Sequence, residues 1–289
     1  MKKYFSYLIK RIARSFVYRS EIMIDISNRL KLEFFKDKVD ENTFLQIQLI
    51  QTLIKNNFLQ TKLLFLGKMN TDGTYPVVKY RDYKNKILLS FGVGNNIILE
   101  AHGAKLGMEV HTFDHTTSIK IPNKFKDKIY YHSVGVTGHK IIPGCLKLEH
   151  IMSLYNISHE KVEILKLDIE GCEWDVLISD LNFIKSFPQL IIEFHDLDKV
   201  TNQQQSSMYF NVLQRIFETH QLIYISPNNF SSFSHVNNII WPFTFEAVFV
   251  ARSILDDTFT GVFDPIKFAE DQVNNRDFGP RISLLSWWQ

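Results

Sequence analysis

One stretch, residues 87–116, constrains the fold of this chain most, because short apolar runs and glycines alternate along it. The first run ends at Phe91 and is long enough for a buried strand but too short for a helix. Gly92 and Gly94 follow, and residues without a Cβ allow a tight turn in which the backbone can approach a ligand closely. A helical segment comes next, and a second apolar run ends at Asp114. This order predicts a parallel strand-helix-strand unit with an acid at the carboxyl end of its second strand.

The position of Asp114 predicts a nucleoside-bearing cofactor. Ligands of open parallel sheets bind beyond the carboxyl ends of the strands. Asp114 lies 22 residues after Gly92, near the offset of about 20 residues at which an acid meets a ribose hydroxyl. Ile97 stands where the dinucleotide pattern G-x-G-x-x-G has its third glycine, which disfavours NAD and its pyrophosphate. S-adenosylmethionine has a ribose without a pyrophosphate and fits better, and an ordinary turn with a solvated aspartate is the alternative.

The composition is that of an ordinary globular protein and excludes several classes. The 289 residues suffice for one large α/β domain with an extension. A net charge of +2 gives no general case for nucleic-acid binding. Cys145 and Cys172 are too few for a disulfide framework, which favours a reducing compartment, and we expect a cytoplasmic protein. No apolar run reaches the roughly 18 residues of a transmembrane helix.

The N-terminal segment is basic and has apolar residues near helical spacing. Residues 1–20 carry six Lys or Arg side chains and no acid. Three interpretations stay open: a helix packed on the domain, an amphipathic helix on an anionic membrane, and a transit peptide. The chain up to residue 66 also has helical spacing. We therefore expect an N-terminal helical extension over residues 1–66, a main domain over 67–255 and a peripheral segment over 256–289.

Two polar segments carry aromatic side chains that could contact a ligand. Residues 67–81 contain Asn, Asp, Gly and Pro and are predicted to form a loop. Residues 227–242 are predicted to form a second loop, whose Phe and Trp side chains suggest an apolar or ring-shaped acceptor. Packing within the domain is the alternative in both cases. The tyrosines considered for substrate or adenine contact are Tyr75, Tyr80 and Tyr83.

Residues 163–177 hold the second informative pattern. A strand ends at Asp168, and Glu170 and a glycine follow before a helix begins. A carboxylate at a strand end points into the crevice, where it can take a proton or orient a nucleophile. Capping of the next helix is the alternative. His195 follows the next strand, and a histidine beside Asp168 can act as a general base near neutral pH.

A metal site is a second interpretation of the same edge. Asp168, His195, Asp196 and His235 could hold a divalent ion that lowers the pKa of a substrate hydroxyl. Their spacing is not diagnostic of a metal site. We therefore predict a site without a metal, in which His195 is the base, Asp168 orients it or the substrate, and His235 is the competing base.

The remaining pattern alternates strands and helices and predicts a doubly wound α/β sheet. The last two strands are separated by a long loop, which suggests an antiparallel pair at the sheet edge. Expected strands lie at residues 129–132, 164–167, 190–194, 222–226 and 246–251. Expected helices lie at 148–155 and 206–220, and a further helix starts around residue 172.

The segment Ile164-Leu-Lys-Leu-Asp-Ile-Glu-Gly-Cys-Glu-Trp-Asp-Val-Leu177 resembles a motif of the FkbM-type methyltransferases, a family of class I S-adenosylmethionine-dependent enzymes. Ile191-Ile-Glu-Phe-His195 and the His235-Val-Asn-Asn238 loop are similar as well. The resemblance covers about residues 85–252. It implies a mostly parallel, Rossmann-like sheet of seven strands with helices on both faces, and methyl transfer from S-adenosylmethionine, often to a hydroxyl of a sugar or secondary metabolite.

The resemblance also assigns residues to roles. Gly92 and Gly94 would contact the methionine part of the cofactor, Asp114 would contact the ribose hydroxyls, and Asp168 would lie next to the methyl donor. Gly135 follows the third strand, at the end that would flank the adenine. The predicted cofactor contacts are Phe91, Gly92, Gly94, Asp114, His115, Gly135 and Asp168, and the predicted catalytic residues are Asp168, His195 and His235.

One departure from the family pattern keeps alternatives open. Ser90 stands where such methyltransferases usually have an acid, and Asn96 replaces a small residue of the turn. The amino group of the cofactor then lacks its usual partner, so a non-catalytic binding protein on a degenerate methyltransferase fold is one alternative. A nicotinamide-dependent oxidoreductase is the other. For the enzyme we expect a small-molecule or glycan acceptor and no nucleic acid, and residues 1–20 are the candidate for peripheral membrane contact.

Overall fold

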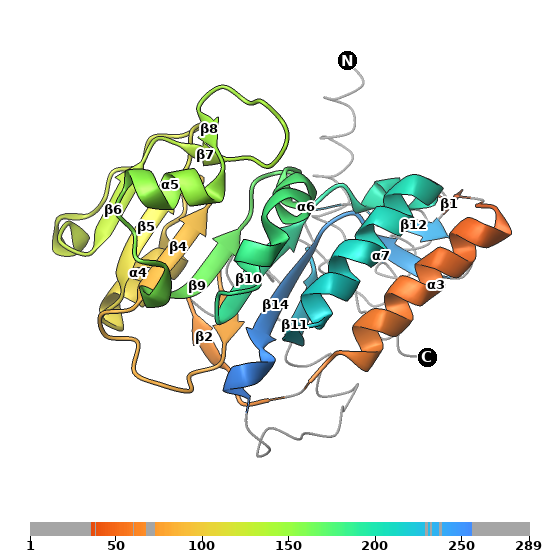
Figure 1. The fold of residues 1–289 in the computed structure, drawn as a ribbon, viewed down its shortest axis with the longest axis horizontal. Helices are drawn as coiled ribbons and strands as arrows, with labels where there is room; N and C mark the ends of the chain where they lie inside the picture. The colour runs from red at the N-terminus through yellow and green to blue at the C-terminus, as the bar shows by residue number, and fades with distance from the viewer. Residues whose placement is uncertain are drawn as a thin grey trace, which may run out of the picture.

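The fold is built around one seven-stranded sheet. The computed structural model describes residues 36–37, 39–59, 61–67, 73–228, 231, 233–236 and 239–255. The strand order is β11-β14-β10-β9-β4-β5-β6 (Figure 1). The five strands from β10 to β6 are parallel, and β14 runs antiparallel to both β10 and β11. The bounds are β4 Ile87–Phe91, β5 Glu109–Phe113, β6 Ile129–His132, β9 Val162–Leu167, β10 Gln189–Phe194, β11 His220–Pro227 and β14 Phe245–Ala251.

This topology confirms the predicted fold class and the antiparallel pair at the sheet edge. The sheet order reverses between β4 and β9, so the helix after β4 and the helix after β9 leave the sheet in opposite directions. A crevice at such a point is where open α/β sheets bind their ligands. The predictions for residues 1–35 and 256–289, including the basic segment, lie outside the described residues.

Helices cover both faces of the sheet. Alternate strand residues point to opposite faces, so Leu88 packs with α4 Ile98–Lys105, whereas Leu89 packs with the helices of the other layer. That layer contains α3 Glu41–Asn56, α5 Leu148–Leu154, α6 Glu173–Ile184 and α7 Gln203–Phe217, with α7 lying between α3 and α6 (Figure 1). No helix among the described residues is long and apolar enough to cross a membrane.

Two predicted segments are wrong in detail. The helical extension ends at Asn56, and β2 Leu64–Leu66 pairs antiparallel with β3 Tyr75–Val77, where a helix and then a loop are predicted. These short strands bury apolar side chains against the face that α4 covers, which outweighs the local helical spacing. The predicted loop 227–242 contains the hairpin β12 Phe233–Val236 and β13 Ile239–Pro242, and β1 Lys36–Asp37 pairs with β12.

The aromatic side chains considered for ligand contact mostly pack within the domain. Tyr75 and Tyr83 are buried, and so is Trp241, whose indole N–H donates to the Leu197 carbonyl at 2.9 Å. Tyr80 is half-buried beside the Arg81 guanidinium. The remaining short elements are β7 Gly135–Val136, β8 Cys145–Leu146, and the 3-10 turns η1 Asn123–Phe125, η2 His159–Lys161, η3 Leu197–Thr201 and η4 Arg252–Ile254.

Candidate active site

The glycine turn after β4 is pressed against the end of β9. Gly92 has a φ of +75°, and a Cβ added to it would lie 1.4 Å from the Asp168 carbonyl oxygen. The Gly92 N–H donates to the Phe113 carbonyl at 3.0 Å, and the Asp168 N–H donates to the Phe91 carbonyl at 3.2 Å. Only a glycine fits this contact. The turn therefore brings the ends of three neighbouring strands together.

Gly94 differs from Gly92 because it faces open space. Its φ is +55°, and a Cβ built on it meets no atom within 4 Å. The Phe91 side chain is fully buried and stacks on Phe113, with ring centroids 4.6 Å apart, so a contact between Phe91 and a cofactor would involve its backbone alone. The open side of the turn lies at Gly94.

Asp114 holds this turn in place. Its Oδ2 accepts the Gly94 N–H at 2.9 Å, and its Oδ1 accepts the Thr116 N–H at 2.8 Å, the Thr116 hydroxyl at 2.7 Å and the Thr117 N–H at 3.1 Å. Burial alone would raise the pKa of Asp114, but these hydrogen bonds together hold it below its ordinary value. A carboxylate oxygen has about two acceptor sites, so Oδ2 keeps one for a ligand hydroxyl.

A carboxyl group lies at the position where Ser90 replaces an acid. The Ser90 hydroxyl donates to Glu100 Oε1 at 2.6 Å, and Glu100, on α4, is buried. Its Oε2 is also buried and has no hydrogen-bond partner among the described residues. Burial raises the pKa of Glu100. Sequence reasoning missed this carboxyl because it comes from a helix ten residues along the chain from the serine.

Lys166 links the turn to Asp168. Its buried ammonium lies 2.8 Å from Asp168 Oδ2 and donates to the Gly92 carbonyl at 3.2 Å. Burial alone would lower the pKa of Lys166, but the carboxylates of Asp168 and Glu100 raise it above its ordinary value. Asp168 is thus the ion-pair partner of a lysine.

Glu173 orients His195, so of the two roles predicted for Asp168 the orientation of the substrate is the one that stays a prediction. Its Nδ1 lies 3.0 Å from Glu173 Oε1, and Glu173 is fully buried and accepts the Ile169 N–H at 2.8 Å. Burial alone would lower the pKa of His195, but the Glu173 hydrogen bond and charge, with Glu193, raise it to about 9. These carboxylates favour the protonated ring, and the role of His195 as the base stays a prediction.

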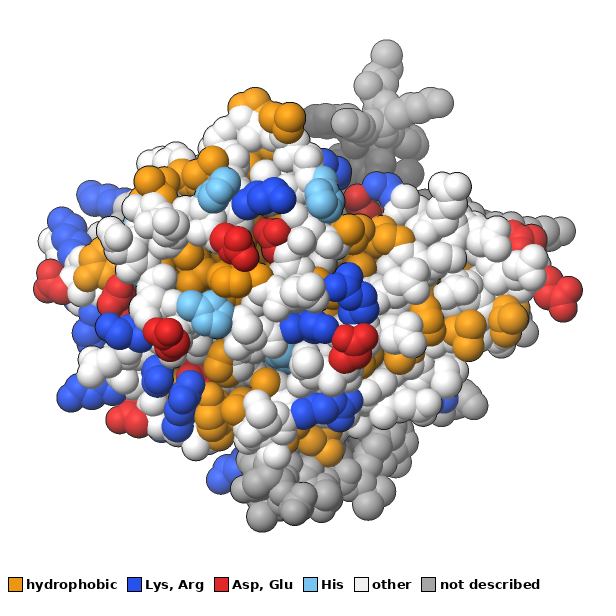
Figure 2. Space-filling view, in the orientation of Figure 1, with side chains coloured by type: hydrophobic (Ala, Val, Ile, Leu, Met, Phe, Trp, Pro, Cys, Tyr) orange, Lys and Arg blue, Asp and Glu red, His pale blue; other side chains and the backbone are white. Residues whose placement is uncertain are grey.

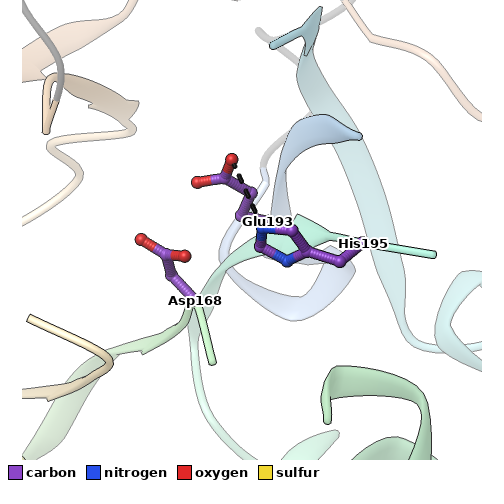
Figure 3. Close-up of side chains that lie close together, drawn as sticks. All are labelled: Asp168, Glu193 and His195. Atoms are coloured by element: carbon purple, nitrogen blue, oxygen red, sulfur yellow. Dashed lines mark ion pairs between the residues drawn. The ribbon is translucent and has the colours of Figure 1, made fainter. Parts of the chain in front are cut away.

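Asp168, Glu193 and His195 form one cluster at the carboxyl ends of β9 and β10. One atom of each side chain lies within 4.8 Å of the others, and Figure 3 shows the three side chains gathered in one place. His195 Nε2 is 3.8 Å from Glu193 Oε1. Burial, followed by the Asp168 charge, raises the pKa of Glu193. Sequence reasoning missed Glu193 as a site residue. The signal was its spacing of two from His195, because side chains two residues apart in an extended chain point to the same side.

Of the other predicted metal ligands, Asp196 does not join this cluster. Asp196 has a φ of +63° and its Oδ2 pairs with Lys199 at 2.7 Å. The backbone of His235 pairs with that of Ile240 in the β12-β13 hairpin, and its side chain lies outside the described part of the chain. The set that could hold a metal among the described residues thus has Glu193 where the sequence suggests Asp196.

The predicted adenine side of the site lies next to the strand ends as well. A Cβ added to Gly135 would lie 2.4 Å from His115 Nδ1 and 2.6 Å from Cys145 Sγ, so Gly135 and His115 are in contact. The loop after Gly135 is braced by Asp175, whose carboxylate accepts the Gly138 N–H at 2.9 Å. The structure therefore brings the residues predicted on β5, β7 and β9 to one edge.

Comparisons with known proteins agree with the fold. The family model described as Methyltransferase FkbM domain matches residues 68–240, more than half of the chain. No curated protein matches.

Three solved structures are similar at low identity. A candidate tRNA (m1A22) methyltransferase from Streptococcus pneumoniae has 12% identity and a TM-score of 0.30, with 58% of this chain and 64% of that chain covered, which is less than two thirds of its length. A candidate hemolysin from Lactococcus lactis has 7% identity and a TM-score of 0.35, covering 59% and 80%. A candidate RNA methyltransferase from Pyrococcus horikoshii has 11% identity and a TM-score of 0.29, covering 59% and 76%. Scores this low carry no information about what the chain acts on.

Proposed function

The chain belongs to the FkbM methyltransferase family, and on that premise we propose that it transfers the methyl group of S-adenosylmethionine to a hydroxyl of a small molecule or glycan. The observation that carries the proposal is the cluster of Asp168, Glu193 and His195 beside the glycine turn. A hydroxyl must lose its proton to act as a nucleophile, and carboxylates and imidazole are the groups that hold or move such a proton.

The residues at the turn fit the cofactor. Gly94 leaves open space, Asp114 Oδ2 keeps an acceptor site for a ribose hydroxyl, and Glu100 supplies an unpartnered carboxyl oxygen where Ser90 lacks one. When bound, S-adenosylmethionine supplies an electrophilic methyl group. Glu100 would take the place of the acid that Ser90 lacks, which supports an enzyme over a degenerate, non-catalytic fold.

The chemistry of the chain is then mainly positioning. Lys166 fixes Asp168 against the turn, and Glu173 fixes the ring of His195, so the two side chains face the same space from neighbouring strands. Holding a nucleophile in line with its target converts a bimolecular step into an effectively unimolecular one. A polar acceptor fits a site rich in carboxylates, since sugar hydroxyls donate to them.

On the face drawn in Figure 2, the mixture of charges suits this acceptor class better than a nucleic acid. Figure 2 shows Lys and Arg side chains interspersed with Asp and Glu on the drawn face, over the elements labelled in Figure 1. Nucleic-acid binding proteins gather their basic residues in a patch or stripe. We also propose that the protein is cytoplasmic, because its two cysteines are too few for a disulfide framework.

The test is a pair of measurements on the full chain. Calorimetry with S-adenosylmethionine should show binding, and radiolabelled methyl should pass from the cofactor into sugars and hydroxylated small molecules as alkali-stable methyl ethers. His195→Ala should lower turnover while leaving cofactor affinity nearly intact, and unchanged turnover would remove His195 from the reaction. Label that enters RNA alone, or carboxyl groups as alkali-labile esters, would overturn the acceptor class, and absence of cofactor binding would favour the binding-protein alternative.

A further inference from the structure

We propose that Asp168, Glu193 and His195 bind a divalent cation, of the Mn²⁺ or Mg²⁺ class, at the carboxyl ends of β9 and β10. This cation would hold the acceptor hydroxyl and lower its pKa, an inference that rests on the proposed function. In this arrangement His195 is a ligand through Nε2 and not the base.

The separation of the ligand atoms suits one ion. The candidate atoms of the three side chains lie within 4.8 Å of one another, and His195 Nε2 to Glu193 Oε1 is 3.8 Å. Two ligands of one ion are separated by at most twice the metal–ligand distance, which is roughly 4.2 Å for Mg²⁺ and about 5 Å for Ca²⁺. Small side-chain rotations would therefore complete the site without backbone movement.

The partner that orients the histidine ligand is already in place. Glu173 is fully buried, fixed by the main-chain N–H of Ile169 at 2.8 Å, and binds Nδ1 of His195 at 3.0 Å. This carboxylate-histidine pair turns the other ring nitrogen, Nε2, toward Glu193. Metal-binding histidines usually have such a partner, which fixes the tautomer and the ring orientation.

Glu193 brings a buried carboxylate into the cluster. It is 6% exposed, and its Oε1 accepts the Asn228 amide and lies 3.8 Å from His195 Nε2. A buried carboxylate that keeps its charge needs an opposite charge nearby. A cation between Glu193 and Asp168 would supply that charge.

The charges around the cluster also leave room for a cation. The carboxylates of Asp168, Glu170, Glu173 and Glu193 lie around one histidine, with the exposed Glu170 Oε2 3.6 Å from Nε2, and the lysine paired with them in the described part of the chain is Lys166, which is bound to Asp168. Buried charges of one sign need compensation. A divalent ion would balance this excess, whereas the ordinary alternative is that the carboxyl groups hold protons.

The donor set decides the class of cation. Carboxylate oxygens suit Mg²⁺ and Mn²⁺, and an imidazole nitrogen suits transition metals, so two carboxylates with one imidazole favour Mn²⁺ among the common choices. Three protein ligands leave coordination positions for water and for the acceptor hydroxyl. The hydroxyl proton passes to water, the oxygen forms a bond to the methyl carbon, and the carbon–sulfur bond breaks with its electron pair on sulfur.

The experiment measures metal binding directly. Full-length protein is stripped with a chelator and titrated with Mn²⁺, and the signal of free Mn²⁺ is followed by electron paramagnetic resonance. The wild type should bind about one equivalent. Glu193→Gln keeps the size of the side chain and its Oε1 acceptor but removes the charge of a ligand. It should weaken binding at least about 10- to 100-fold, which is the loss seen when only the hydrogen-bond partner of a ligand is removed.

The matched control is Asp196→Asn. Asp196 lies at the same strand end, pairs with Lys199 at 2.7 Å and sits at a positive φ that asparagine tolerates. It should bind Mn²⁺ like the wild type, with circular dichroism reporting that each variant is folded. Equal binding by wild type and Glu193→Gln, or no binding by the wild type, would overturn the proposal.

The two proposals fail separately. Stripped protein that methylates hydroxyls at full rate without binding Mn²⁺ would overturn the metal site and leave the proposed function standing. Protein that binds Mn²⁺ at Glu193 but methylates no hydroxyl would support the metal site and overturn the acceptor class. Hydroxyl transfer that requires Mn²⁺ and is lost in Glu193→Gln would support both.

Discussion

We predict different consequences when a methyl group is added to each of the two glycines of the turn. At Gly92 an added Cβ would lie 1.4 Å from the Asp168 carbonyl oxygen, whereas at Gly94 it would meet nothing within 4 Å. Both residues have positive φ, +75° and +55°. We therefore expect Gly92→Ala to disrupt the fold locally, and Gly94→Ala to leave the fold intact but fill the space that the cofactor needs.

The magnitudes follow from the contacts. A left-handed conformation costs an alanine about 1–2 kcal/mol, and this is the whole expected cost at Gly94. At Gly92 the strand ends would also have to separate by about 2 Å to reach a normal contact, which breaks the Asp168 N–H to Phe91 carbonyl hydrogen bond at 3.2 Å. Loss of a buried hydrogen bond adds about 1–3 kcal/mol. The expected loss is thus about 2–5 kcal/mol for Gly92→Ala.

The assay combines urea unfolding with calorimetry. Gly94→Ala should lower the free energy of unfolding by about 1–2 kcal/mol and weaken S-adenosylmethionine binding at least about tenfold, whereas Gly92→Ala should unfold at clearly lower urea. Gly107→Ala is the matched control, because Gly107 has a φ of +89° and lies beside Lys84, away from the site. It should lose stability without losing cofactor affinity.

Two results would refute this reasoning. If Gly94→Ala binds the cofactor like the wild type, the open space is not the cofactor site. If Gly92→Ala is no less stable than Gly94→Ala, the contact with Asp168 does not constrain the turn.

Three further predictions address stability and the cofactor site. Asp114→Asn should weaken S-adenosylmethionine binding in calorimetry and cost about 1–3 kcal/mol in urea unfolding, since an amide cannot accept all of the bonds from the turn and Thr116. Burial lowers the pKa of His220 to about 4 against 6.5, so its contribution, up to about 3 kcal/mol, is complete above pH 6.5 and lost as the pH falls toward 4; urea unfolding across this range should show it, and His220→Gln should flatten the slope. Tyr83→Phe removes a buried hydroxyl that donates to the Val78 carbonyl at 2.7 Å, so unfolding should lose about 1–3 kcal/mol while cofactor affinity stays the same.

The site shows where sequence reasoning reaches its limit. Gly92, Gly94, Asp114 and Asp168 were predictable because glycine turns and acids at strand ends are local patterns, and the structure brings them to one edge. Their roles in binding the cofactor and the acceptor remain predictions. Glu173 was not predictable as the partner of His195, because 22 residues and a helix separate them.

Local patterns of apolar residues and glycines, read along the chain, determined the order of strands and helices and the family of this protein. Register and burial decided the rest: Glu100 became the partner of Ser90, and Glu193 joined the cluster in place of Asp196. The hairpin of β2 and β3 formed although the chain before it has helical spacing. The physical reason is that the free energy contributed by a carboxylate or a short apolar run depends on the side chains packed against it. Those neighbours lie far away in sequence.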